Sequence, residues 1–333
     1  MRFSLRLNND LPLALYPRLA RVAEDAGFDQ FWVSDDLFLH SVWIILASVA
    51  QATERIGIGT CIVNPCTMHP AEMAMAAASL NELAGGRALL GISSGAEDFL
   101  NWIGMRPERP VTAVAETITA LRRLWRGERH HPPGAYLQEW STEAYLRAGR
   151  PARDIPIYVG AMSPRMLRLI GERADGGLPL LFPPEHFTEA MTHMRQGAAA
   201  AGRSVDEVDV AACIWCSIAD DHHAAEQVLR EKLAYYGHAF SPAILARVGL
   251  SRADFEPIQQ QMRLGDGDAA AALVTPDMLR LGMVGTAVSL IPRLELLVDL
   301  GARHLSFGPP LGPDLFEAID ALGRDVLPHF RDP

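Results

Sequence analysis

Short apolar runs alternate along this chain with longer runs in which apolar residues recur every three or four positions. Residues 2–7 alternate as a strand does, and an apolar stripe at Leu11, Leu15, Leu19 and Val22 follows with helical spacing. Strands that alternate with helices are typical of parallel α/β proteins. The same reading predicts eight strands, at residues 2–7, 30–34, 56–63, 88–93, 155–159, 177–181, 208–218 and 304–307.

Two segments interrupt this alternation. Residues 128–154 are rich in Gly, Pro, Arg and His, which predicts a long surface excursion. Residues 221–282 read as helical and polar, and they are too long for an ordinary connection between a strand and its helix. Eight strand–helix units without a G-x-G-x-x-G motif therefore predict a closed (β/α)8 TIM barrel with a helical insertion after strand 7, at about 221–282.

The barrel is expected to be one domain spanning residues 1–333. The alternative is a pair of doubly wound halves joined near residues 128–154, and it is the weaker interpretation because that segment is the only candidate linker. Either architecture belongs to the α/β class.

Composition and charge exclude several classes of protein. Hydrophobic residues make up 49% of the chain, which excludes a disordered protein, and the net charge of −10 gives no basis for a nucleic-acid partner. The four cysteines are too few for a disulfide scaffold. No apolar run approaches the roughly 18 residues of a membrane span, and MRFSLRLNND lacks the apolar stretch of a signal peptide. We expect a soluble cytoplasmic protein.

Polar residues follow several predicted strands, at the end of a barrel where functional groups gather. Asp35 and Asp36 follow the second strand, and Glu97 and Asp98 follow the fourth. Two neighbouring carboxylates raise the pKa of one of them and can hold a proton near neutrality. The alternatives are that an Asp of the first pair caps the next helix and that the second pair is solvated loop. The strand ends do not resemble a metal site.

The segment GAMSPRM, residues 160–166, carries an anion-site signal. Small residues end the fifth strand, Ser163 stands at a predicted N-cap, and Pro164 stands at the first helical position. Backbone N–H groups at the start of a helix bind phosphates. The competing interpretation is a helix cap with no ligand.

Several segments resemble a known superfamily over nearly the whole chain. AEDAGFDQFWVSDD (residues 23–36), ATERIGIGTCIVNPCTMHPA (52–71), LNELAGGRALLGISSG (80–95) and IPIYVGAMSPRMLRLIGERADG (155–176) resemble the luciferase-like flavin and deazaflavin oxidoreductases. Within that superfamily the resemblance is to the branch of the coenzyme F420-dependent 5,10-methylenetetrahydromethanopterin reductases. It implies a TIM barrel, a homodimer, and coenzyme F420 or alternatively FMN at the barrel mouth.

The resemblance also implies site residues. A bulge in strand 3 with a cis bond between Cys61 and Ile62 is expected to back the ring of the cofactor. The remaining expected cofactor contacts are Asp35, Asn64 and Gly95 at the ring and Gly160, Ala161, Met162 and Ser163 at the phosphate.

The substrate side departs from the family pattern. Relatives carry His where this chain has Asp36. They carry an acid where this chain has Ala96, and the acid of this chain, Glu97, follows one position later. The pterin reductases carry an acid where this chain has Arg6. Asp36 and Glu97 are the predicted catalytic residues. The expected function is hydride transfer between F420 and a small organic substrate. The alternatives are an FMN-dependent monooxygenase served by a separate flavin or F420 reductase, and a non-catalytic flavin-binding relative.

Overall fold

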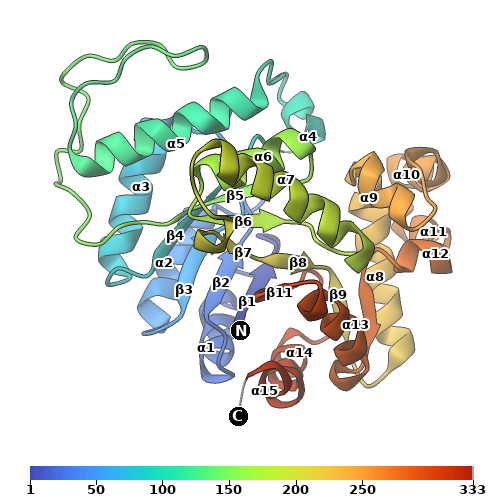
Figure 1. Ribbon diagram of the computed structural model, residues 1–333. Coiled ribbons are helices and arrows are strands. Elements are labelled where there is room, and N and C mark those ends of the chain that lie inside the picture. The colour runs from blue at the N-terminus through green and yellow to red at the C-terminus, as the bar shows by residue number, and fades with distance from the viewer. Residues whose placement is uncertain (96, 332–333) are drawn as a thin grey trace.

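A ring of parallel strands forms the centre of the computed structural model, which describes residues 1–95 and 97–331, with only the backbone at 97 and 98 (Figure 1). In hydrogen-bonding order the strands are β7 (Asp209–Val210), β6 (Gly176–Pro179), β5 (Ile157–Ala161), β4 (Ala88–Ile92), β3 (Gly57–Thr60), β2 (Gln30–Val33), β1 (Arg2–Leu7), β11 (His304–Phe307) and β8 (Ala212–Ile214).

The ring closes through β7 and β8, which follow each other along the chain. β7 pairs with β6 and β8 pairs with β11, while a bridge between Leu180 and Cys213 joins the two edges. Together β7 and β8 therefore occupy one position in the ring, and the predicted (β/α)8 barrel is confirmed.

The prediction of one continuous strand at 208–218 is wrong. Its last part, β9 (Cys216–Ile218), leaves the ring and pairs with β10 (Met283–Gly285), which follows the insertion. The third strand is also shorter than predicted, because β3 ends at Thr60 before the backbone turns at Cys61 and Ile62.

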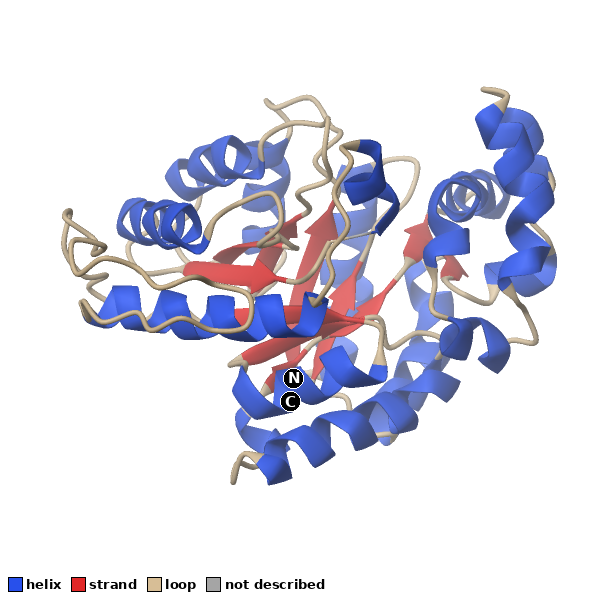
Figure 2. Ribbon diagram, turned by 90° about the horizontal axis from the view of Figure 1, so that it is seen from above, coloured by secondary structure: helices blue, strands red, loops and turns tan. Residues whose placement is uncertain are grey.

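Helices surround the ring, as the view from above shows (Figure 2). Their apolar stripes pack on the outward-facing residues of the strands, such as Phe3, Leu5 and Leu7 of β1. The outer helices are α1 (Tyr16–Asp25), α2 (Val42–Ala52), α3 (Pro70–Leu83), α5 (Pro110–Arg126), α6 (Pro164–Arg173), α7 (Phe187–Ala200), α13 (Ala287–Asp299), α14 (Leu315–Ala321) and α15 (Leu327–Phe330). Short turns of other helix types are η1 (Pro184–His186), η2 (Val205–Glu207) and η5 (Leu322–Val326).

The interior of the barrel contains a polar network around Asp209. Its carboxylate contacts His304 Nδ1 at 3.0 Å and accepts a hydrogen bond from the Tyr158 hydroxyl at 2.5 Å. His304 Nε2 lies 2.8 Å from Ser4 Oγ, so the network continues toward β1. Arg2 also pairs with Asp209. Because these groups satisfy one another, the polar interior is compatible with burial.

The insertion after the seventh strand is helical, as predicted, and stands at the C-terminal end of the barrel (Figure 1). Its apolar residues, among them Leu229, Phe240 and Phe255, join Trp32 and Tyr158 of the barrel in one cluster. The insertion therefore packs over the mouth. Its helices are α8 (His222–Tyr236), α9 (Pro242–Arg247), α10 (Glu256–Arg263), α11 (Gly267–Ala272) and α12 (Pro276–Leu279), with turns η3 (Gly237–Ala239) and η4 (Arg252–Phe255).

Residues 128–154 contain neither helix nor strand and run over the outside of the barrel, as predicted (Figure 1). Glu116 of α5 anchors this excursion by accepting hydrogen bonds from the amides of Ala135, Tyr136 and Leu137 at 2.7, 3.0 and 2.8 Å. The Tyr136 hydroxyl donates to Pro65 O at 3.0 Å, which connects the excursion to the loop after β3.

Candidate active site

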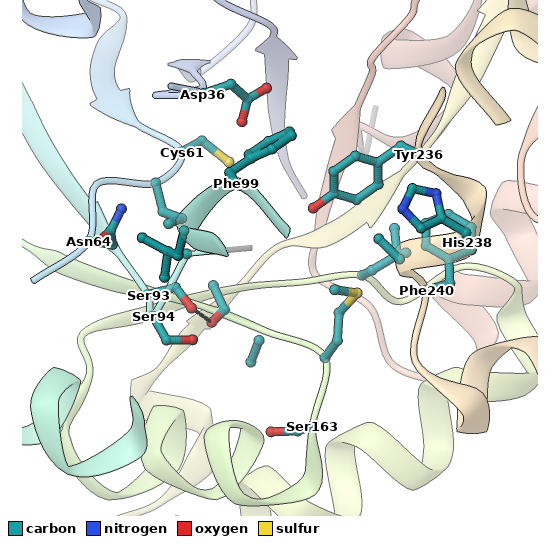
Figure 3. A pocket seen from close by; sticks show the side chains of 18 of the residues that line it. Asp36, Cys61, Asn64, Ser93, Ser94, Phe99, Ser163, Tyr236, His238 and Phe240 are labelled. Atoms are coloured by element: carbon teal, nitrogen blue, oxygen red, sulfur yellow. Dashed lines mark hydrogen bonds between the residues drawn. The ribbon is translucent and has the colours of Figure 1, made fainter. Parts of the chain in front are cut away.

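A cavity of about 680 Å³ lies at the C-terminal ends of the strands, between the barrel and the insertion. Figure 3 shows Cys61, Asn64 and Ser93 on one side of it and Tyr236, His238 and Phe240 on the other. All the sequence-predicted cofactor contacts lie in its wall, namely Asp35, Cys61, Ile62, Asn64, Gly95, Gly160, Ala161, Met162 and Ser163.

The end of β3 has the expected irregular backbone. The bond between Cys61 and Ile62 is a non-prolyl cis peptide, and both residues line the cavity. After it, Val63 returns to the sheet, and its amide donates to Gly91 O at 3.0 Å. Asn64 Oδ1 then accepts from the amides of Cys66 and Thr67, both at 3.1 Å. The side chain of Asn64 thus forms the turn that follows the bulge.

Two glycines keep the wall of the cavity open. Gly95 has a φ of +78°, and a Cβ there would lie 3.2 Å from Asn64 Nδ2. A Cβ on Gly160 would lie 3.1 Å from Ile62 Cγ2. The Ser93 hydroxyl donates to Gly160 O at 2.7 Å and holds β4 and β5 together at this point. A flat ligand can therefore approach the backbone here more closely than any side chain would allow.

The loop between β5 and α6 ends at the predicted N-cap. Ser163 Oγ accepts from the Met166 amide at 3.4 Å, and Pro164 occupies the first turn of α6. The predicted N-cap at Ser163 is confirmed. Because Ser163 also lines the cavity, the start of α6 lies where an anionic group of a ligand would meet it.

Asp35 lies at the start of α2. Burial raises its pKa to about 6, the neighbouring Asp36 raises it too, and a hydrogen bond from the Val42 amide acts in the opposite direction. Asp35 is thus the residue of the pair that contacts the beginning of a helix. A carboxyl group with this pKa changes its charge close to neutral pH.

Asp36 lines the cavity and has a different environment. Burial raises its pKa, Lys232 lowers it, and Asp10 raises it. The Ser34 hydroxyl lies 3.5 Å from Asp36 Oδ2. The N-cap of α2 is Ser41, and because Asp36 lines the cavity its carboxylate can act on a molecule there. Glu97 begins the short helix α4 (Glu97–Trp102), but its side chain, like Ala96, lies outside the described residues.

Sequence reasoning missed much of the wall. The insertion contributes residues that no strand-end pattern indicates, among them Tyr236, His238, Phe240, Arg252 and Phe255. Arg6 also lines the cavity, and its guanidinium donates to Ile214 O at 2.8 Å and to Ser306 Oγ at 3.1 Å. Lys232 of α8 acts on Asp36 from the insertion, and the only signal for it in the sequence is that the chain contains no other lysine.

Among the described residues no group of three or more His, Cys, Asp or Glu side chains could hold a metal ion. Within the same part of the chain, every helix is too short or too polar to cross a lipid bilayer.

Comparison with known proteins points in the same direction. The luciferase-like monooxygenase family model matches residues 3–304. The 5,10-methylenetetrahydromethanopterin reductase of Methanolobus tindarius is 32% identical over 98% of this chain and 100% of its own. The F420-dependent glucose-6-phosphate dehydrogenase of Microbacterium testaceum is 30% identical over 93% of this chain and 91% of its own.

The solved structures agree with the sequences. The coenzyme F420-dependent tetrahydromethanopterin reductase of Methanopyrus kandleri superposes with a TM-score of 0.91 at 30% identity, covering 99% of both chains. The barrel, its insertion and its mouth are thus shared with that enzyme over the whole length. This chain belongs to the luciferase-like monooxygenase family, on the side of the family where similar sequences are coenzyme F420-dependent reductases and dehydrogenases.

Proposed function

We propose that this protein is a coenzyme F420-dependent oxidoreductase that transfers hydride between the deazaflavin and a small organic substrate. The observation that carries the proposal is the single cavity that joins the bulge at Cys61 and Ile62, the open backbone at Gly160 and the start of α6. The proteins similar to this chain over nearly its full length include F420-dependent enzymes, which supports this coenzyme over FMN.

The residues present fit such a coenzyme. The bulge would support one face of a flat ring, and Gly160 and Gly95 leave the space that side chains would otherwise fill. Ser163 and the first amides of α6 would hold the phosphate end, with Arg165 as a nearby positive charge. When bound, the deazaflavin supplies the carbon that accepts or releases hydride.

The protein itself positions the reactants and handles a proton. Asp36 is the proposed proton donor or acceptor, because its half-buried carboxylate lines the cavity. Asp35 holds the start of α2 and lies against the coenzyme side. Tyr236 and Phe240 of the insertion would exclude water from the reacting groups. Glu97 remains a second candidate acid on the loop after β4.

A substrate different from the pterin is favoured by Arg6. The pterin reductases that the sequence resembles carry an acid at this position, whereas here a guanidinium lines the cavity. A positive charge in place of a negative one reverses the preference for charged groups on the substrate. We therefore propose a small organic molecule other than methylenetetrahydromethanopterin.

Titration of the protein with oxidised F420 and, separately, with FMN tests this function, with ligand fluorescence as the readout. Saturable binding of F420 in preference to FMN is expected, followed by a substrate-dependent change in deazaflavin absorbance. Preference for FMN would instead indicate a monooxygenase that needs a separate reductase. Tight F420 binding without turnover on a broad set of alcohols, aldehydes and imines would indicate a non-catalytic relative.

We also propose that the protein acts as a cytoplasmic homodimer formed through α2 and α3. Ile44, Met75 and Leu83 on these helices are large apolar side chains that are 61%, 58% and 47% exposed, and a partner subunit would cover them. Light scattering at micromolar concentration should give twice the chain mass. Met75→Glu should reduce it to the monomer mass, whereas a monomeric native protein would contradict the proposal.

A further inference from the structure

Lys232 is the only lysine in a chain of 333 residues, in which the other 29 cationic side chains of the 30 Lys and Arg are arginines. The two residue types are not equivalent, because an ammonium is compact and can lose its proton, whereas a guanidinium is broad and remains charged. A lysine at a single position of such a chain can fill a role that arginine cannot.

The ammonium of Lys232 is enclosed by aromatic rings. It lies 5.3 Å from the ring centre of Trp215, 5.6 Å from that of Tyr236 and 6.0 Å from that of Tyr235. The negative faces of the rings attract the ammonium. Its Nζ also donates to Asn8 Oδ1 at 3.4 Å, which connects α8 of the insertion with the loop after β1.

Lys232 lies behind the wall of the cavity. Trp215 and Tyr236 line the cavity, and so does Asp36, whereas Lys232 does not. A molecule in the cavity would therefore meet Asp36 and the two rings, and Lys232 would act on that molecule only through them. The insertion supplies the positive charge, and the loop after β2 supplies the negative one.

We propose that Lys232 is a positioning residue for Asp36. The ammonium of Lys232, enclosed by aromatic rings, supplies the counter-charge that lets the half-buried carboxylate of Asp36 ionise during the reaction. The inference rests on the proton-handling role of Asp36 proposed above. It also gives the insertion a defined task, because the charge that acts on a group in the loop after β2 comes from α8.

The other charges around the pair are consistent with this role. Burial lowers the pKa of Lys232, Asp36 and Asp10 raise it, and Arg6 lowers it. For Asp36, burial raises the pKa and Lys232 opposes that effect. Tyr235 and Tyr236 also contact Lys232, and Ser34, Asp35 and Cys61 also interact with Asp36.

A single-lysine chain allows a direct test. Protein grown with ¹³C,¹⁵N-lysine has one labelled side chain, and the Cε–Hε signal of Lys232 can be followed through a pH titration. We expect a midpoint below that of free lysine and a still lower one in Asp36→Asn, because that change removes a charge that stabilises the ammonium. Asp35→Asn is the matched control, since Asp35 does not act on Lys232.

An unchanged Lys232 midpoint in Asp36→Asn would overturn the inference. The result does not depend on coenzyme or substrate, so it stands apart from any failure of the proposed function. Both variants are first compared with the wild type by circular dichroism. If Asp36→Asn unfolds, Asp36→Glu replaces it. Glutamate moves the carboxylate one methylene further from the backbone and should also change the titration midpoint of Lys232.

The pH profile of turnover gives the second readout. Lys232→Met keeps the apolar stem and removes the charge, so the limb of the profile controlled by Asp36 should move to higher pH. Arg280→Met removes the same charge from an exposed part of the insertion and should leave the limb in place. An unmoved limb in Lys232→Met would contradict the inference. A limb that persists in Asp36→Asn would instead contradict the proposed function.

Discussion

Asn9 holds the backbone of Asp36 from both sides. Its Nδ2 donates to Asp36 O at 3.0 Å, and its Oδ1 accepts from the Asp36 amide at 3.2 Å. The Ser34 hydroxyl donates to the same Oδ1 at 2.9 Å. Asn9 is itself fully buried. The loop after β2 is therefore fixed through its backbone, which leaves the Asp36 carboxylate available for chemistry in the cavity.

Replacing that carboxylate should affect turnover more than binding. Asp36→Asn keeps the size of the side chain and its backbone contacts with Asn9, and it removes the group that exchanges a proton. We expect turnover to fall by roughly 10²–10⁴-fold with F420 affinity nearly unchanged. Steady-state kinetics and fluorescence titration measure the two quantities.

The control for this change is Asp320→Asn, an exposed position on α14 at the opposite end of the barrel. It should leave both quantities unchanged. If Asp36→Asn keeps full turnover, or if it lowers thermal stability and F420 affinity together, Asp36 has a structural role and the proton is handled elsewhere.

The barrel could be predicted because each strand–helix unit has its own pattern. The break in the seventh strand could not, since residues 208–218 are mostly apolar both where they stay in the ring and where they leave it. Val210 belongs to β7, Ile214 to β8 and Ile218 to β9, and nothing local separates the three. What separates them is the pairing partner, β6, β11 or β10, which is a property of the folded chain.

The candidate site likewise contains residues that the sequence predicts and residues that only the fold reveals. The family resemblance implied Cys61, Asn64 and Gly160, and these positions lie at or near strand ends, which a parallel barrel brings to one end. Lys232 is 224 positions away from Asn8, its hydrogen-bonding partner, and it comes from a helix of the insertion. No local pattern relates two such residues. The sequence alone also leaves open which of Asp35 and Asp36 contacts the next helix. The fold decides it, because the Val42 amide donates a hydrogen bond to Asp35.

The pKa of Asp35 gives a pH-dependent stability. Its folded-state pKa of about 6 lies above the roughly 3.9 of an unfolded chain, so between these values the unfolded state releases the proton first. The wild type should therefore lose stability relative to Asp35→Asn as the pH rises from about 4 to about 6, and the difference should stay constant at higher pH. Urea denaturation at several pH values measures the difference. A difference that does not change with pH would show that Asp35 titrates normally in the fold.

Gly160 offers a test of the coenzyme position. Alanine there would bring a Cβ to 3.1 Å from Ile62 Cγ2, so the side chain behind the proposed ring would have to move. We expect F420 affinity to fall by about tenfold to a hundredfold, which corresponds to the roughly 1–3 kcal/mol of an overpacked contact. Gly267→Ala, where a Cβ meets no atom within 4 Å, should bind F420 as the wild type does. Equal affinities of the two variants would place the ring elsewhere.

The network inside the barrel predicts a large stability effect far from the cavity. Burial raises the pKa of Asp209, but the hydrogen bonds and charges of His304, Tyr158 and Arg2 outweigh burial and hold that pKa well below its usual range. Asp209→Asn leaves Arg2 without its counter-charge and His304 without its carboxylate partner. The expected loss is about 3 kcal/mol, at the lower end for a broken buried pair, because the Arg2 side chain is 47% exposed.

The sign of the pH dependence follows from the depressed pKa. Asp209 contributes its full stabilisation above the pKa of about 4 that an unfolded chain gives an aspartate, and this contribution is lost as the pH falls toward the lower folded-state value. The difference between wild type and Asp209→Asn should thus be complete at pH 7 and decrease below about pH 4. Asp206→Asn is the matched control, because its pair with Arg303 is exposed and should be worth no more than about 1 kcal/mol. If both variants lose the same small amount at pH 7, the interior network contributes little, and the closure of the ring depends on its apolar contacts instead.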